Sequence, residues 1–316
     1  MKNLHCLSLA ALALVTLATG TQAQSGASSQ LSALAASGLG ACDRTTAAAA
    51  TGCASEASAD LSYALGACEN EPVLAAKQTC QTRATNAFNE ARDLCLSQAS
   101  ARNAVCNAIG QLPYDPAFAP ADFSVNFTNP LFPLKVGSVW LYRNGPSEVT
   151  VTVTPNTRKL GGVTTRVVHD VNRVSGVIEE DTFDYYAQRK DGNVWYFGED
   201  TIKYDNGIAD TTGSWRTGTG GAKPGILMFA HPVLNKTYRQ EFNLGTAEDM
   251  ARPLLFGQHV SVPFGTFNNA LKTREFTAIE PGRAEFKFYL PNVGNVLTID
   301  SDTAEHEGLV TYTPGP

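Results

Sequence analysis

The sequence lacks the features of several common classes of protein. Its 316 residues carry 24 Lys and Arg against 30 Asp and Glu, a net charge of −6, without a cluster of basic residues. An acidic chain without a basic patch is a poor partner for nucleic acid, so we predict no nucleic-acid partner. No later stretch approaches the roughly 18 apolar residues of a membrane helix, so we predict no transmembrane anchor.

Familiar catalytic and cofactor motifs are also missing. The sequence has no Gly-x-Ser-x-Gly elbow and no His-Glu-x-x-His pair, and its histidines stand singly. It has no Cys-x-x-Cys pair, and no histidine lies between residues 24 and 168, which leaves no zinc-ligand pattern there. We therefore predict no cofactor, apart from Ca²⁺ at one pair of carboxylates.

The first 23 residues are typical of a secretory signal peptide. MKNLHCLSLAALALVTLATGTQA has one basic residue, Lys2, and then an apolar run that is too short to span a bilayer. We expect cleavage after Ala23, which removes Cys6 and changes the net charge from −6 to −7. The mature protein is then exported to the periplasm or to the outside of the cell.

Six cysteines remain after the signal peptide, and their spacing is symmetrical. Three nested pairs are all centred on Leu74: Cys42–Cys106, Cys53–Cys95 and Cys68–Cys80. The flanking segments are rich in Ala with Leu, Gln, Arg and Glu, which are good helix formers. An antiparallel helical hairpin over residues 24–112 with these three disulfides fits that symmetry. The disulfides would replace a core, because the first helix has few large apolar side chains.

A second domain is predicted over residues 131–313, after a proline-rich linker at 113–130. Short runs rich in Val, Thr, Tyr and Phe alternate there with polar residues, which is the pattern of strands with one buried face. These runs are 138–143, 148–153, 164–171, 236–242, 284–290 and 295–300. We predict a strongly curved antiparallel sheet. A capping-box-like pattern from Thr246 to Asp249 favours a short helix at that point.

The second domain resembles a family of secreted bacterial proteins without an assigned function. The resemblance covers about residues 131–312 and lies in YYAQRKDGNVWYFGEDT, GAKPGILM, YRQEFNLGTAEDMA and VPFGTFNNALKTREFTAIEPG. It implies an open half-barrel like that of periplasmic lipoprotein carriers, and it implies no activity. The predicted fold class is therefore α+β in two separate domains, a disulfide-linked helical hairpin and an open, curved antiparallel sheet.

Asp191-Gly192 lies between two β-rich runs and predicts a two-residue hairpin turn. The resulting register places three pairs on one face of the hairpin: Gln188–Trp195, Tyr186–Phe197 and Asp184–Glu199. Carboxylates directly opposite each other on neighbouring strands repel, so this last pair needs an explanation.

Three interpretations of Asp184 and Glu199 are open. The pair could hold a cation such as Ca²⁺, which prefers carboxylate and carbonyl oxygens. It could instead be a catalytic acid/base pair in which one carboxyl raises the pKa of the other. In the third interpretation both side chains point into water, screened by Lys203 and Arg189.

These observations lead to three hypotheses for function. The first is an exported binding protein whose curved sheet holds a hydrophobic or lipid-like ligand, either a small molecule or an envelope component. The second is a secreted polymer-degrading hydrolase or lyase that uses Asp184 and Glu199, with Glu248 and Asp249 in reserve. The third is a structural or adhesive envelope protein in which the helical hairpin is a spacer.

Overall fold

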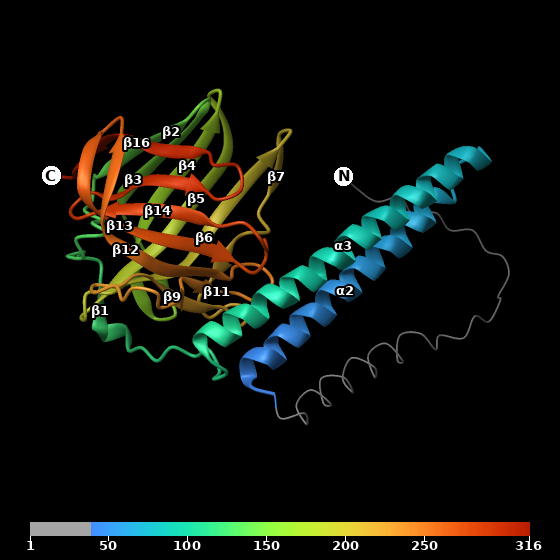
Figure 1. The fold of residues 1–316 in the computed structure, drawn as a ribbon, viewed down its shortest axis with the longest axis horizontal. Coiled ribbons are helices and arrows are strands. Elements are labelled where there is room, and N and C mark those ends of the chain that lie inside the picture. The colour runs from blue at the N-terminus through green and yellow to red at the C-terminus, as the bar shows by residue number, and fades with distance from the viewer. Residues whose placement is uncertain (1–38) are drawn as a thin grey trace.

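The computed structural model describes residues 39–316, in which a pair of long helices projects from a β-barrel (Figure 1). The predicted signal peptide, its cleavage site after Ala23 and residues 24–38 lie outside the described residues. No helix among residues 39–316 is both long enough and apolar enough to cross a membrane.

The helices α2 (Ala41–Cys68) and α3 (Leu74–Ile109) are antiparallel, and both are built largely from alanine and other good helix formers. Three disulfides join them, with Cα–Cα distances of 5.6, 5.7 and 5.6 Å: Cys42–Cys106, Cys53–Cys95 and Cys68–Cys80. These are the pairs that the cysteine spacing predicts. Gly110, with φ of +92°, follows the last turn of α3 and ends it.

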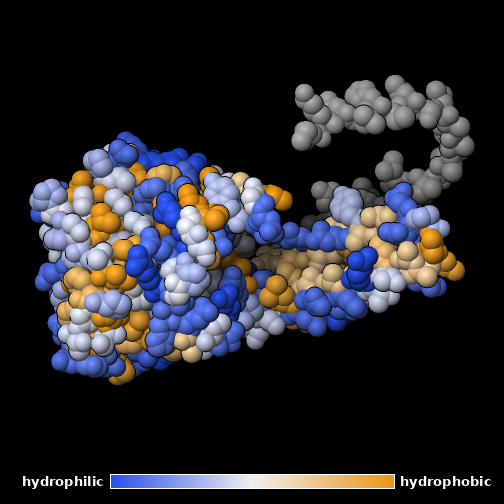
Figure 2. All heavy atoms as spheres, turned by 90° about the horizontal axis from the view of Figure 1, so that it is seen from above, coloured by the Kyte–Doolittle hydropathy of each residue, from blue (hydrophilic) through white to orange (hydrophobic). Residues whose placement is uncertain are grey.

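The helix pair has almost no conventional hydrophobic core. Its buried residues are mostly cysteines and small side chains: Cys42, Thr46, Ala57 and Cys68 in α2, and Ala84, Cys95, Arg102, Val105 and Cys106 in α3. Along the pair the surface is only mildly hydrophobic, as its alanine content dictates (Figure 2). The three disulfides therefore stabilise the helix pair in place of the packed apolar side chains of a larger bundle.

The second part of the chain is an antiparallel sheet of long, twisted strands. Its strands are β1 (Phe123–Ser124), β2 (Val139–Asn144), β3 (Ser147–Leu160), β4 (Val163–Val174), β5 (Val177–Arg189), β6 (Val194–Asp205), β7 (Ile208–Asp210), β8 (Trp215–Arg216), β9 (Lys223–Met228), β10 (Tyr238–Arg239), β11 (Glu241–Phe242), β12 (Asp249–Val262), β13 (Gly265–Thr277), β14 (Glu285–Leu290), β15 (Gly294–Asp300) and β16 (His306–Thr313). The main path follows the order β10-β12-β13-β14-β15-β16-β2-β3-β4-β5-β6-β9-β11.

The two ends of this path meet, so the predicted open half-barrel is wrong and the 13-strand path forms a nearly closed barrel. Only Gln240 separates β10, which pairs with β12, from β11, which pairs with β9. The Gln240 backbone N–H donates to the Asp249 carbonyl at 2.8 Å, and its side-chain amide donates to the Leu227 carbonyl at 3.4 Å. Twisted strands with several bulges, as in β12 and β13, curl the sheet until its edges meet.

The short helix predicted from Thr246 is also wrong. Asn243 and Ala247 form an isolated bridge around a tight turn, and β12 begins at Asp249. Gly245, with φ of +82°, provides the left-handed residue of this turn. Its N–H donates to the Glu248 carboxylate at 2.8 Å, so a nearby acidic side chain caps a turn and not a helix.

The proline-rich segment 113–130 is extended, but it lies against the barrel. Its strand β1 pairs with β5, and a 3₁₀ turn at Pro120–Asp122 precedes it. Phe118 and Phe123 pack edge-to-face against Phe197 on the outer face of the sheet. This segment therefore adds an outer layer over β5 and β6.

Candidate functional site

The hairpin of β5 and β6 has a longer turn than predicted. The Arg189 N–H donates to the Asn193 carbonyl at 2.9 Å, and the Gly192 N–H donates to the Arg189 carbonyl at 2.8 Å. The loop therefore comprises residues 190–192, with Gly192 at φ of +83°. This is the three-residue class of hairpin, in which a glycine takes the left-handed position.

A bulge in β6 corrects the register before the acidic pair is reached. Tyr186 lies opposite Tyr196, whereas Asp184 lies opposite Glu199, so β6 has one extra residue between them. The extra residue falls next to Gly198, whose φ is +141° and where a Cβ would overlap the carbonyl oxygen of a neighbouring strand. The predicted pairing of Asp184 with Glu199 is therefore found, although the turn is different.

The longer loop shifts the two other predicted pairs by one residue, because both lie between the loop and the bulge. Gln188 lies opposite Val194 and not opposite Trp195. Trp195 and Phe197 belong to a small outer core together with Tyr185, on the face opposite to Tyr186. The predicted single face that holds all three pairs is therefore wrong, because a one-residue shift exchanges the faces of a strand.

Asp184 and Glu199 lie within the barrel and do not point into bulk water. Asp184 is only 9% exposed, and the Tyr196 hydroxyl donates to its Oδ1 at 2.6 Å. Lys203, expected to screen the pair, instead lies 3.6 Å from Glu180. The solvated interpretation of the pair does not fit this arrangement.

The barrel changes the protonation of both carboxyls. Burial raises the pKa of Asp184 to about 6, with the hydrogen bond from Tyr196 opposing it. Burial, and then the charge of Asp184, raise the pKa of Glu199 to about 8. Of the two carboxyls, Glu199 therefore keeps its proton to the higher pH.

An acidic cavity of about 490 Å³ opens beside Glu199. Eight acidic residues line it: Glu180, Glu199, Glu241, Asp249, Glu275, Glu280, Glu285 and Asp300. Three basic residues line it as well: Lys203, Arg283 and Lys287. Asp249 is accessible from the cavity, yet enclosure by the barrel walls raises its pKa to about 6. This part of the lumen thus carries an excess of carboxyl groups.

Lys287 forms ion pairs with two of the acidic residues that line the lumen. Its Nζ lies 3.2 Å from the Glu275 carboxylate and 3.1 Å from the Glu285 carboxylate, and its charge lowers the pKa of Glu285. The hydroxyls of Tyr289 and Thr273 also donate to Glu275, at 2.7 and 3.0 Å. Lys203 pairs with Glu180, and Arg283 pairs with Glu280 and Asp300. Among residues 39–316, Glu199, Glu241 and Asp249 are the cavity acids without an ion-pair partner.

A second, more apolar cavity of about 270 Å³ adjoins the acidic one, and the two share Glu275, Glu285 and Lys287. Its apolar lining comes mainly from the strands β2, β3, β4 and β9 and from the segment before β2: Phe132, Leu134, Trp140, Tyr142, Val149, Val151, Val168 and Leu227. Asp184 lines this cavity and Glu199 lines the acidic one, so the predicted pair lies where they meet.

Most of these lumen residues are missing from the sequence prediction. The alternation of Glu285, Phe286, Lys287 and Phe288 is visible in the sequence, but in a sheet the polar face is expected outside. In the structure Glu285 and Lys287 line the lumen, whereas the ring of Phe286 packs under the ammonium of Lys272 at 4.2 Å. The sequence did contain a signal for a polar face on this strand, because the charged residues Glu285 and Lys287 are two positions apart and therefore point the same way.

Glu248 and Asp249 were the reserve candidates for catalysis, and only Asp249 lines the lumen. Glu248 is buried on the other side of β12, where it pairs with Arg102 of α3. Within residues 39–316, no three His, Cys, Asp or Glu side chains are grouped so that they could hold a metal ion. A Ca²⁺ ion at Asp184 and Glu199 stays a prediction.

The fold and the lumen together define a nearly closed antiparallel barrel with an accessible interior. No protein-family model and no curated protein matches the chain. Two solved structures are similar to it. One, provisionally described as an exported protein with a YmcC-like fold from Bacteroides fragilis, is 12% identical and has a TM-score of 0.32. The match covers 58% of this chain and 98% of that one.

The other is provisionally described as a lipoprotein from Parabacteroides distasonis. It is 14% identical, with a TM-score of 0.33, and the match covers 60% of this chain and 100% of that one. The comparison thus finds one bacterial protein described as exported and one described as a lipoprotein. Likeness at this level says nothing about ligand or activity.

Proposed function

We propose that the protein is an exported binding protein whose barrel lumen holds an amphiphilic ligand. The apolar part of the ligand would lie in the cavity lined by Trp140, Val151 and Leu227, and a cationic group such as an amine would lie among the carboxyls beside Glu199. The observation that carries the proposal is the junction, within one lumen, of an acidic cavity with a cavity whose lining is mostly apolar.

The charge of the lumen decides the kind of head group. Eight acidic and three basic residues line the larger cavity, and Lys287 is already paired with two of the acids. A fatty-acid carboxylate would meet like charges there, whereas an ammonium would replace protons on carboxyls whose pKa is raised. A lipid-like ligand therefore fits if its polar end is a cation.

Titration calorimetry with three probes tests the proposal: decylamine, butylamine and 1-decanol. We expect decylamine to bind about tenfold more tightly than either of the others, because only decylamine fills both cavities with matching chemistry. Binding at neutral pH should also release a proton, mainly from Glu199, which is detected as a dependence of the measured enthalpy on the buffer.

Two variants make the test specific. Glu199→Gln removes a carboxyl of the lumen and should weaken decylamine binding and abolish most of the proton release. Glu179→Gln is the matched control, since Glu179 is exposed on β5. Equal or tighter binding of 1-decanol to the native protein, or unchanged proton release in Glu199→Gln, would contradict the proposal.

A second candidate is the hydrolase or lyase, and the separation of pKa values between Asp184 and Glu199 favours it. One carboxylate ionised at neutral pH beside one protonated carboxyl is the arrangement of a general base and a general acid. Asp184→Asn should then abolish cleavage of an envelope or environmental polymer while the protein stays folded. Full activity of this variant would remove Asp184 from the mechanism.

A further inference from the structure

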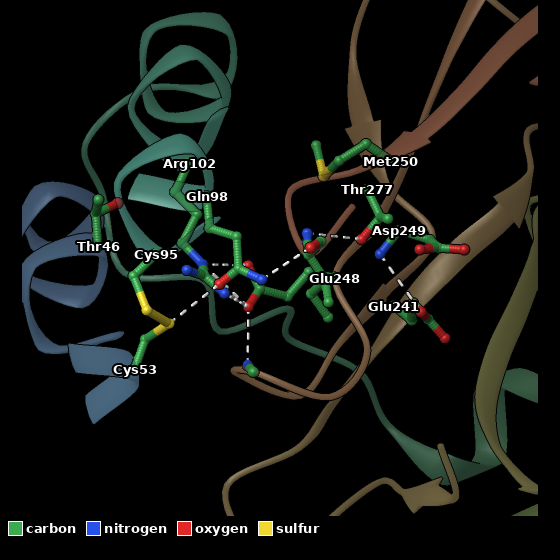
Figure 3. Close-up of polar contacts among 12 residues, drawn as sticks. Thr46, Cys53, Cys95, Gln98, Arg102, Glu241, Glu248, Asp249, Met250 and Thr277 are labelled. Atoms are coloured by element: carbon green, nitrogen blue, oxygen red, sulfur yellow. Dashed lines mark hydrogen bonds and ion pairs between the residues drawn. A yellow bond between two sulfur atoms is a disulfide. The ribbon is translucent and has the colours of Figure 1, made fainter. Parts of the chain in front are cut away.

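The helix pair meets the barrel through a buried ion pair. Arg102 of α3 donates to the Glu248 carboxylate from Nε at 3.1 and 2.9 Å and from Nη2 at 2.8 Å (Figure 3). Gln98, one turn earlier, donates to the Ile279 carbonyl at 2.8 Å. Glu248, the residue just before β12, points to the helices, whereas Asp249, the first residue of β12, points into the lumen (Figure 3).

A cavity of about 440 Å³, the junction cleft, lies beside this ion pair between α2, α3 and the strands β10 and β11. Its walls are largely apolar and include the Cys42–Cys106 disulfide. The side chains that give it this character are Val105, Ile109, Leu112, Tyr114, Phe242 and Leu244. The size is that of a site for a small organic ligand.

Two guanidinium groups in the cleft have donors without an acceptor. Arg102 is 6% exposed, and its Nη1 has no hydrogen-bond partner among the described residues, because Glu248 occupies only Nε and Nη2. The Nε of Arg239 is likewise buried without a partner within residues 39–316. Buried donors that lack an acceptor are costly, so each of them marks a place for one.

The charge and the rings of the cleft favour an anion with an apolar body. Arg102 and Arg239 bring two positive charges against the single carboxylate of Glu248. The Arg239 guanidinium lies over the rings of Tyr114 and Phe242, with distances of 5.4 and 4.7 Å to the ring centroids. Its flat faces are thus covered by aromatic rings, and its edge is left for a hydrogen-bond acceptor.

We propose that the junction cleft binds a small organic carboxylate with an apolar tail. The Arg102 and Arg239 side chains turn slightly towards the cleft, so that Arg102 Nη1 and Arg239 Nε donate to the carboxylate. The tail lies along the apolar wall formed by α3 and Phe242. This site is separate from the lumen and has the opposite charge preference. A ligand held there touches both the helices and the barrel, so it stabilises their contact.

Titration calorimetry with octanoate on the full mature chain tests this proposal, with acetate and 1-octanol as comparison probes. Octanoate should bind about tenfold more tightly than either of the other two, because only it combines the carboxylate with the tail. Binding of octanoate that is no tighter than that of acetate or octanol would overturn the proposal.

Three variants locate the binding. Arg239→Met keeps an apolar stem over the rings but removes the donor, and it should weaken octanoate binding about tenfold. Leu244→Trp keeps both arginines and fills the cleft, so it should abolish binding and serves if Arg239→Met unfolds. Arg252→Met removes an exposed arginine of β12 outside the cleft and should change the affinity by less than about twofold.

Competition separates the cleft from the lumen. Octanoate binding should be the same in Glu199→Gln as in the native protein, and saturation with decylamine should leave it unchanged. If octanoate binding survives in both Arg239→Met and Leu244→Trp, or is lost in Glu199→Gln, the carboxylate binds elsewhere and the cleft assignment is wrong. These outcomes do not depend on whether the lumen binds an amine.

Discussion

Replacing Glu199 by Gln should flatten the pH dependence of stability. In the folded barrel the pKa of Glu199 is raised from 4.5 to about 8 by burial and by Asp184. Between these values the folded chain holds a proton that the unfolded chain has released. The free energy of unfolding contributed by this group is therefore highest at low pH and is lost as the pH rises towards 8.

The size of the effect follows from proton linkage. One extra proton in the folded state changes the free energy of unfolding by about 1.4 kcal/mol per pH unit, or about 3 kcal/mol between pH 5.5 and 7.5. Glu199 touches the water-accessible lumen and is coupled to Asp184, which reduces the expected change to about 1.5 kcal/mol. The native protein should be more stable at pH 5.5 than at pH 7.5 by at least this amount.

Urea unfolding at the two pH values, followed by tryptophan fluorescence, measures the effect. Glu199→Gln should lose about 1.5 kcal/mol of the difference between the two pH values, because its amide does not titrate. Glu179→Gln, at an exposed position of β5, should keep the native difference. If Glu199→Gln kept the full native difference, Glu199 would already be ionised in the folded state and the account of an enclosing lumen would fail.

Three further changes probe other parts of the molecule. Arg102→Met leaves the buried carboxylate of Glu248 without its partner and should cost about 3–5 kcal/mol in urea unfolding, and adding Glu248→Gln should recover part of that loss. Removing the middle disulfide with Cys53→Ser and Cys95→Ser should lower the stability of the helix pair by about 2 kcal/mol, seen in far-ultraviolet circular dichroism, while the tryptophan fluorescence of the barrel is unchanged. Gly198→Ala should destabilise the barrel by about 2 kcal/mol or more, because its backbone has φ of +141° and a Cβ would overlap a facing carbonyl; an unchanged urea midpoint would show that the bulge can relax.

The helix pair could be predicted because its signals are local. Cysteine spacing, helix period and alanine content act along one stretch of chain, and together they fix the three pairings around Leu74. Closure of the barrel could not be predicted in this way. It depends on Tyr238–Phe242, a segment that pairs with β12 at one end and with β9 at the other. No local sequence pattern indicates that one short segment will pair with two sheet edges that are distant in the sequence.

The candidate site was predictable only in part. Asp184 lies opposite Glu199 because an extra residue in the loop and an extra residue in the bulge at Gly198 offset each other. Neither departure from a regular hairpin is evident from Asp191-Gly192. The other lumen acids were missed for a topological reason, since closing a sheet turns its polar face into an interior. Alternation identifies the two faces of a strand but does not say which one is enclosed.

The scarcity of packed side chains between α2 and α3 makes assembly of the helix pair depend on oxidation. A newly made chain in a reducing compartment has no disulfides, and alanine surfaces alone hold two helices together weakly. All six cysteines of the described chain lie in the helix pair, so the barrel contains no disulfide. We therefore expect the barrel to fold first and the contact of Arg102 with Glu248 to form last, after the three disulfides have fixed the helix pair.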